Sequence, residues 1–99
     1  MKYNVKLTAE ASKDYERLDN HQKLHVNKSF AKIERDGMLV GEALHGNLAG
    51  CRKLKHLRLG LRIVFREVNS EVEIIEVIVI GKKSDSEVYK EAEKRLKLN

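Results

Sequence analysis

The sequence predicts a single α+β domain spanning residues 1–99, in which a helical hairpin and a terminal helix pack against a small, antiparallel-rich sheet. Three observations predict this fold. The first half holds one alternating segment and two segments with helical spacing, the second half holds runs rich in β-branched residues, and the last part opens with a helix-start signal. The expected order is strand, helix, helix, three strands and a final helix.

The first half is expected to form a strand and two helices. Apolar and polar residues alternate over residues 3–7, which is strand spacing, and Thr8 then offers an N-cap to a helix. Asp19 and Gln22 have the spacing of a capping box for a second helix, which Gly37 would end. The apolar faces of the two helices are Ala11, Tyr15 and Leu18, then Val26, Phe30 and Ile33. Residues 9–36 hold six Lys/Arg and six Asp/Glu, so this hairpin is assigned a structural role.

The second half is expected to form three strands. Residues 62–68 and 72–80 are rich in Ile, Val and Phe, and Asn69-Ser70 between them has turn chemistry. Residues 72–80 show little polar alternation, which predicts a central strand covered on both faces. Residues 52–59 predict a strand ending near Gly60, although Leu54 and Leu57 could share a face only across a bulge.

The chain is expected to end in a helix. Ser84 and Glu87 have capping-box spacing, and the apolar stripe that follows consists of Val88, Ala92 and Leu96. The chain contains no proline, internal repeat or low-complexity run, which favours one compact unit. Because it has one cysteine, no apolar signal segment and no apolar run long enough to cross a bilayer, we expect a cytoplasmic protein without a membrane partner.

Positive charge is concentrated in one stretch of the chain. Residues 43–66 contain no Asp or Glu but six Lys/Arg, whereas the whole chain has a net charge of +5. Lys53 and Lys55 are two residues apart, so in a strand they leave the same face, and Arg62 on the next strand can project beside them. These cations predict a phosphate site. The alternative is an exposed sheet face that lysine keeps soluble.

Common catalytic and cofactor motifs are absent from the sequence. His21 and His25 form an i, i+4 pair without the glutamate of a zinc-protease motif, and the chain has no CxxC, phosphate-binding glycine loop or GxSxG elbow. We therefore expect no metal ion and no other cofactor.

The sequence does resemble one known family, the RelE toxins of bacterial toxin–antitoxin modules. The resemblance covers nearly the whole chain, including LTAEASKDYERLD at 7–19, and its most specific part is residues 79–96. The matching runs are CRKLK at 51–55, GLRIVF at 60–65, VIGKK at 79–83 and SEVY at 86–89, followed by Ala92, Arg95 and Leu96.

The resemblance implies the toxin of a type II toxin–antitoxin system acting in a stress response. Such a toxin is a ribosome-dependent, metal-independent mRNA endoribonuclease, or mRNA interferase, which cuts mRNA in the ribosomal A site by attack of a 2′-hydroxyl on the adjacent phosphate and so inhibits translation. The implied partners are a cognate antitoxin, in a toxin–antitoxin hetero-oligomer, together with the 70S ribosome and mRNA. The antitoxin would be an acidic, partly disordered segment that covers the basic surface or displaces the terminal helix.

The resemblance also implies roles for individual residues. Lys53 and Lys55 would transfer protons and stabilise charge, since crowding by cations is expected to lower a lysine's pKa toward neutrality. Arg62 would hold the scissile phosphate and Tyr89 would stack on the target nucleotide. Lys83 stands where these toxins commonly have arginine, which keeps the charge but loses the bidentate geometry. Further RNA-contact candidates are His45, Arg52, His56, Arg58, Arg66 and Lys82.

Other readings of these residues stay open. Tyr89 could be an aromatic residue at the edge of the core, and Arg62 could cap a strand end. The related ParE toxins share the fold but poison DNA gyrase, and a non-catalytic RNA-binding or ribosome-binding module could use the same basic face. Lys53, Lys55, Arg62 and Tyr89 occurring together favour the nuclease.

Overall fold

The computed structural model describes residues 2–69, 74–82 and 84–98. Within these ranges, five strands form one sheet and three α-helices pack on it, so the predicted α+β class is confirmed. The strands are β1 (Asn4–Leu7), β2 (Glu42–Ala43), β3 (Cys51–His56), β4 (Leu61–Asn69) and β5 (Ile74–Gly81). The α-helices are α1 (Ala9–Glu16), α2 (Asn20–Asp36) and α3 (Asp85–Arg95), and two short 3₁₀ turns are η1 (Gly37–Leu39) and η2 (Gly46–Leu48).

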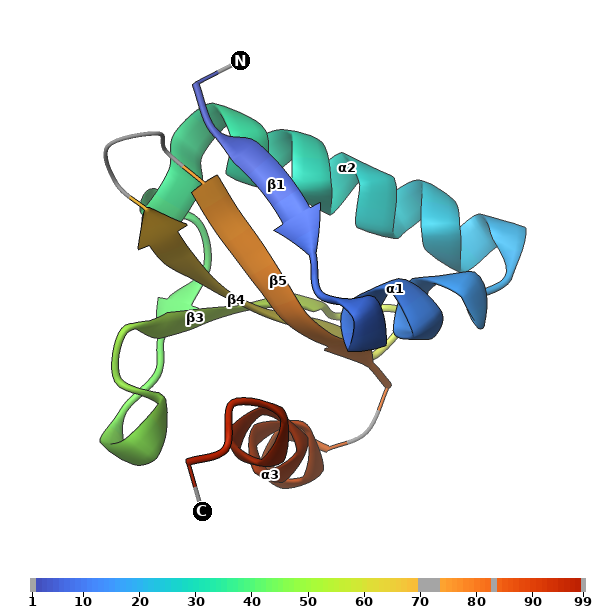
Figure 1. Ribbon diagram of the computed structural model, residues 1–99. Coiled ribbons are helices and arrows are strands. Elements are labelled where there is room, and N and C mark those ends of the chain that lie inside the picture. The colour runs from blue at the N-terminus through green and yellow to red at the C-terminus, as the bar shows by residue number, and fades with distance from the viewer. Residues whose placement is uncertain (1, 70–73, 83, 99) are drawn as a thin grey trace.

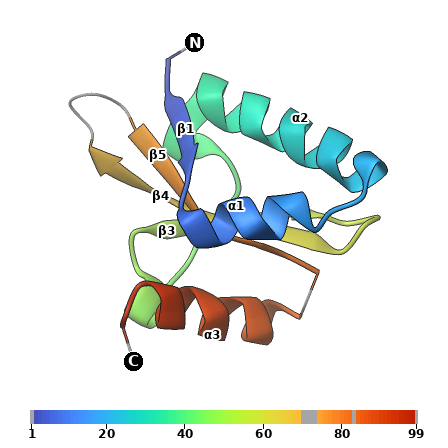
Figure 2. The same cartoon turned by 45° about the vertical axis from the view of Figure 1, so that its right-hand side comes forward.

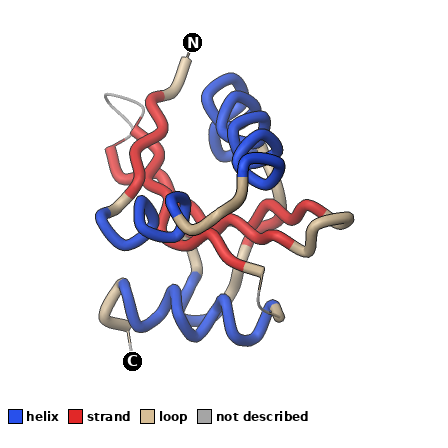
Figure 3. The backbone as a smooth tube through the Cα atoms, turned by 90° about the vertical axis from the view of Figure 1, so that its right-hand side faces the viewer, coloured by secondary structure: helices blue, strands red, loops and turns tan. Residues whose placement is uncertain are grey.

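The sheet is mixed, with the strand order β1-β5-β4-β3-β2. β1 pairs in parallel with β5, and the other neighbours are antiparallel. Figure 1 shows α1 and α2 on one face of the sheet and α3 on the other, and the two turned views agree (Figures 2 and 3). The first two helices therefore form a scaffold on one side of the sheet, while α3 packs on the other side.

The predicted helix starts are confirmed. The Thr8 hydroxyl accepts a hydrogen bond from the amide of Ala11 at 3.0 Å, and Asp19 and Gln22 form the reciprocal capping box. Ser84 accepts from the amide of Glu87 at 3.3 Å at the start of α3. These bonds satisfy backbone donors that have no partner within the helix, so local sequence fixes where each helix begins.

Each face of the sheet carries its own apolar cluster. The face under α1 and α2 buries Ala11, Val26, Ile33, Val40, Leu61, Ile63, Phe65, Ile75, Val77 and Ile80. The face under α3 buries Leu44, Leu48, Cys51, Val64, Ile78, Val79, Val88 and Ala92. β5 contributes to both clusters, as its apolar run predicts for a central strand.

An irregularity in β5 explains how that strand serves both faces. Val64 pairs with Val79 whereas Phe65 pairs with Val77, so Ile78 is an extra residue opposite β4. The bulge lets Ile78 and Val79 both join the cluster beneath α3, which strict alternation would forbid.

The strand predictions need two corrections. The third strand in the chain ends at His56 rather than near Gly60, and Leu57 lies in the following turn with 82% of its surface exposed, so no bulge is needed there. The two-residue strand β2 was not predicted because Glu42 and Ala43 are exposed and carry no apolar pattern. Of the predicted 69–70 turn and 72–80 strand, residues 70–73 lie outside the described residues.

Candidate active site

The pairing of β3 with β4 brings the predicted cations onto one face of the sheet. Lys55 lies directly opposite Arg62, and Lys53 lies opposite Val64. Because alternate residues of a strand share a face, Lys53, Lys55 and Arg62 leave the sheet on the side of Val64, which is the side covered by α3. The prediction that these three residues leave the same face of the sheet is therefore confirmed.

A carboxylate from α3 reaches two of these cations. One oxygen of Asp85 lies 3.1 Å from the Lys53 ammonium, and the other accepts a hydrogen bond from Nε of Arg62. Arg62 also donates from Nη1 to the carbonyl of Gly60 at 2.7 Å. The side chains of Lys53 and Arg62 are only 8% and 12% exposed, whereas that of Asp85 is 42% exposed. The carboxylate thus lies on the solvent side of two nearly buried cations.

The surroundings of Lys53 keep it protonated. Burial is the largest single influence and acts to lower the pKa of Lys53, but interactions with Tyr89 and Asp85 together outweigh it, so the pKa is raised above 10.5. The expectation that crowding by cations lowers this pKa is therefore wrong. The hydrogen bond from Arg62 is the main cause that holds the pKa of Asp85 below 3.8, followed by contact with Lys53 against an opposing effect of burial.

Tyr89 lies beside the same cluster, one helical turn after Asp85. The Lys53 ammonium is 5.7 Å from the centre of the Tyr89 ring. Tyr89 and His45 line one cavity of about 360 Å³, together with Glu42, Ala43, Leu44 and Leu48. The predicted RNA-contact residue His45, which precedes η2, is therefore next to the predicted stacking residue. An aromatic ring at the edge of such a cavity can support a flat, apolar group.

Two predicted RNA-contact residues point to the opposite face from Lys53. Arg52 donates hydrogen bonds to the carbonyls of residues 40 and 41 at 2.8 and 2.6 Å, so its guanidinium holds the segment before β2 in place. The ring of His56 lies 4.5 Å from that of His25 on α2, and its Nδ1 accepts from the amide of Leu59. The structure does not bring these two residues to the Asp85 cluster.

The remaining cations lie around the edge of the site. Lys55 is exposed and, with residues of α2, lines a separate groove of about 290 Å³, and Arg58 is exposed in the turn after β3. Arg66 shares the sheet face of Arg62 but forms an ion pair with Glu76 at 3.3 Å. Lys82 is exposed near the end of β5. Lys83 lies outside the described residues.

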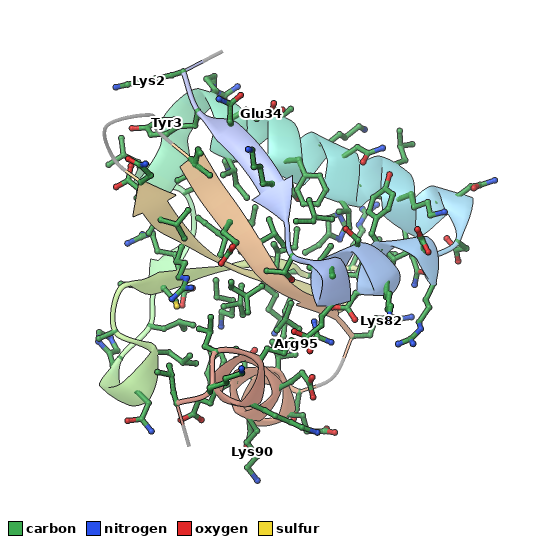
Figure 4. The ribbon with its side chains drawn as sticks, viewed as in Figure 1. Lys2, Tyr3, Glu34, Lys82, Lys90 and Arg95 are labelled. Carbon is green, nitrogen blue, oxygen red and sulfur yellow. The ribbon has the colours of Figure 1, made fainter. Side chains whose placement is uncertain are left out.

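A second ion-pair cluster, at the other end of α3, holds the helix in place. Arg95 forms a bidentate pair with Asp14 of α1 at 2.6 and 3.0 Å, and it also donates to Glu91 at 2.8 Å and to the carbonyl of Ile78 at 3.0 Å. Figure 4 shows Arg95 between α3 and the sheet, whereas Lys90 of the same helix points away from the protein. The hydrogen bond that Arg95 donates to Asp14 is the main cause that raises the pKa of Arg95. This cluster fixes α3, and with it Asp85 and Tyr89, over β3 and β4.

Sequence reasoning missed Asp85 and Arg95 as parts of these clusters. The sequence predicts Asp85 only as part of a helix start, because its partners Lys53 and Arg62 lie far from it along the chain. The i, i+4 spacing of Glu91 and Arg95, by contrast, signals an ion pair. In the part of the chain that the structure describes, no group of three or more His, Cys, Asp or Glu is placed to hold a metal ion.

The fold and the site together define a small α+β protein with a cationic centre beneath its last helix. No protein-family model matches the chain. Among curated proteins, it is similar to a RelE-like toxin protein of Escherichia coli, with 29% identity over 98% of this chain and 100% of the relative. It is also 28% identical to the mRNA interferase toxin RelE of Escherichia coli (strain K12), over 97% of this chain and 99% of that protein.

Solved structures show the same likeness. A mutant of the Escherichia coli toxin RelE in the free state aligns with a TM-score of 0.80 and 28% identity, covering 97% of this chain and 99% of the other. A RelE mutant in complex with a peptide of the antitoxin RelB aligns with a TM-score of 0.75 and 27% identity, over 93% and 95% of the two chains. The resemblance to RelE toxins is therefore confirmed, and the chain is a homologue of these toxins in sequence and fold.

Proposed function

We propose that this chain is the toxin of a type II toxin–antitoxin pair and that it cleaves mRNA on the ribosome. The proposal rests on one observation: Lys53 and Arg62 lie beneath α3 and Lys53 is close to the ring of Tyr89, which that helix carries. The chain is also a homologue of an mRNA interferase. Two nearly buried cations beside an aromatic ring are suited to a nucleotide, since phosphate needs positive charge and a base needs a flat surface.

Arg62 is the proposed phosphate-binding residue. Its guanidinium is held by the carbonyl of Gly60, so its position is restricted before RNA arrives. A planar guanidinium can donate two parallel hydrogen bonds to phosphate oxygens. Such a donor stabilises the extra negative charge that develops on phosphorus during attack.

Lys53 and Lys55 are the proposed proton-transfer residues. In the reaction the 2′-oxygen forms a bond to phosphorus and loses its proton, while the bond to the 5′-oxygen breaks and that oxygen gains a proton. Because its pKa is raised, Lys53 acts as a positive charge and as the proton donor to the 5′-oxygen rather than as the base. Lys55, which is exposed opposite Arg62, is the proposed proton acceptor. These steps use side chains alone, so a metal ion is not required.

Tyr89 is the proposed support for the target nucleotide. Its ring borders the 360 Å³ cavity that His45 also lines, which has room for a nucleobase. Stacking on an aromatic ring tolerates every base, so Tyr89 would position the nucleotide rather than select it.

An antitoxin is the proposed protein partner. The structure of a mutant of the Escherichia coli toxin RelE has been solved in complex with a peptide of the antitoxin RelB, and 93% of this chain aligns with that toxin. An acidic segment that covers Lys53 and Arg62, or that displaces α3, would silence the site. None of the helices described is long and apolar enough to span a membrane. Action on ribosomes would place the protein in the cytoplasm.

Primer extension on a defined mRNA in a purified translation system tests the proposal. Cuts should appear within the A-site codon only when ribosomes are present, and a Lys53→Ala/Lys55→Ala variant should abolish them while still binding ribosomes. An intact message, together with inhibition of DNA gyrase supercoiling in a parallel assay, would assign the protein to the ParE mode instead. Ribosome binding without cuts by either protein would identify a non-catalytic binding module.

A further inference from the structure

Asp85 places a carboxylate where a phosphate would bind. Its two oxygens contact two different cations, Lys53 at 3.1 Å and Nε of Arg62. The two non-bridging oxygens of a nucleic-acid phosphate offer the same pair of acceptors to the same donors. From this geometry we infer that Asp85 is an internal competitor for the RNA phosphate, so that RNA binds only by displacing it from Lys53 and Arg62. The inference rests on the proposed function, because it concerns control of the same site.

Burial supports this assignment. The cations are 8% and 12% exposed, while the carboxylate that covers them is 42% exposed. A phosphate approaching from solvent therefore meets the carboxylate first. Since like charges repel and each cation can be satisfied by either anion, the carboxylate and the phosphate exclude each other.

The position of Asp85 on α3 makes displacement feasible. Asp85 is the first residue of the helix, but it does not cap it. The cap is its neighbour Ser84, whose hydroxyl accepts a hydrogen bond from the amide of Glu87. The far end of α3 is fixed independently by the contact of Arg95 with Asp14. The helix can therefore keep its cap and its anchor when the Asp85 side chain turns away. The positive end of the helix dipole also favours a phosphate near this point.

Competition between Asp85 and the RNA phosphate predicts that removing the charge of Asp85 strengthens RNA binding. Asp85→Asn keeps the size of the side chain but removes its charge, so RNA should bind about threefold to fivefold more tightly, which is the effect of losing one partly exposed ion pair. Glu87→Gln is the matched control. It removes one negative charge from the same turn of α3, and the carboxylate it replaces contacts the Ser84 hydroxyl. A general gain from lower negative charge would appear equally in both variants.

The test measures the binding of a fluorescent 2′-O-methyl RNA hexamer by fluorescence anisotropy. Because its 2′-oxygens are methylated, this RNA cannot be cleaved by 2′-hydroxyl attack. Asp85→Asn should lower the Kd several-fold and Glu87→Gln should leave it within twofold of the parent. In an Arg62→Ala background the gain from Asp85→Asn should shrink. Circular dichroism and thermal unfolding check that each variant is folded.

Three outcomes would overturn the inference. Equal Kd values for Asp85→Asn and Glu87→Gln would show that Asp85 does not compete, and weaker binding by Asp85→Asn would show that it positions the cations instead. A Kd unchanged by Arg62→Ala would place the RNA elsewhere. None of these readouts needs cleavage, so failure of the nuclease proposal, seen as an uncut message on ribosomes, is distinguished from failure of the competition.

Discussion

The two ends of α3 carry ion-pair clusters with opposite excess charge. At the C-terminal end, the single cation Arg95 is surrounded by the carboxylates of Asp14, Glu91 and, at 3.9 Å, Glu10. At the N-terminal end, the single carboxylate Asp85 is shared by Lys53 and Arg62. Negative charge is therefore in excess around Arg95, whereas positive charge is in excess around Asp85. The comparison separates a cluster that holds the fold from one that can still attract an anion.

The largest expected effect on stability is at the C-terminal cluster. Arg95→Ala should lower the free energy of unfolding by about 3 kcal/mol, because it leaves Asp14, whose side chain is 9% exposed, buried without its cation. Urea denaturation measures this effect, with Lys94→Ala on the exposed side of the same helix as the control. Equal stability of the two variants would contradict a structural role for this cluster.

The opposite pattern is expected at the N-terminal cluster. Arg62→Ala should reduce the rate of ribosome-dependent cleavage about 100-fold, the usual result of removing one fixed donor to a developing negative charge. Its unfolding free energy should change by less than about 1 kcal/mol, because Asp85 remains solvated. Arg35→Ala, at an exposed arginine on α2 on the other face of the sheet, is the matched control and should cleave normally.

A smaller effect is expected at Tyr89, which lies between the two clusters on α3. Tyr89→Ala should weaken binding of the 2′-O-methyl RNA about tenfold, since stacking on an aromatic ring contributes about 1–3 kcal/mol per base. Tyr89→Phe keeps the ring and should bind within twofold of the parent. A loss in the Phe variant equal to that in the Ala variant would assign the role to the hydroxyl instead of the ring.

The smallest expected effect concerns the pH dependence of stability. The pKa of Asp85 in the folded protein lies below 3.8, so the stabilisation from its ion pairs is present above that pH and is lost as the pH falls through the folded value. The difference in unfolding free energy between the parent and Asp85→Asn should be below about 1 kcal/mol at pH 7, because the carboxylate is 42% exposed. It should shrink as the pH falls below 3.8 in acid titrations monitored by denaturation. A difference that does not shrink there would exclude an electrostatic origin.

Local patterns in the sequence predicted most of the elements but not the way the sheet assembles. The caps at Thr8, Asp19 and Ser84 were predictable because each is a bond between residues three apart. The bulge at Ile78 and the parallel pairing of β1 with β5 were not predictable, since both depend on which strands become neighbours. The two-residue strand β2 is too short to show alternation.

The same distinction applies to the candidate site. Lys53 and Lys55 could be assigned to one face because they are two residues apart on a strand. Asp85 contacts Lys53 and Arg62 across 32 and 23 residues of chain, so no local pattern reveals it. The wrong expectation for the pKa of Lys53 has the same cause, because Tyr89 and Asp85, which raise that pKa, both lie on α3, far from Lys53 along the chain.

The central claim is that the cluster of Lys53, Arg62 and Asp85, which has excess positive charge, performs the chemistry while the cluster around Arg95 holds the fold. The most direct measurement is the single-turnover rate of mRNA cleavage on ribosomes for the parent, Arg62→Ala and Arg95→Lys, at a temperature where thermal unfolding shows all three folded. We predict a loss of about 100-fold for Arg62→Ala and a near-parental rate for Arg95→Lys, which keeps the charge beside Asp14. Near-parental cleavage by Arg62→Ala would contradict the account.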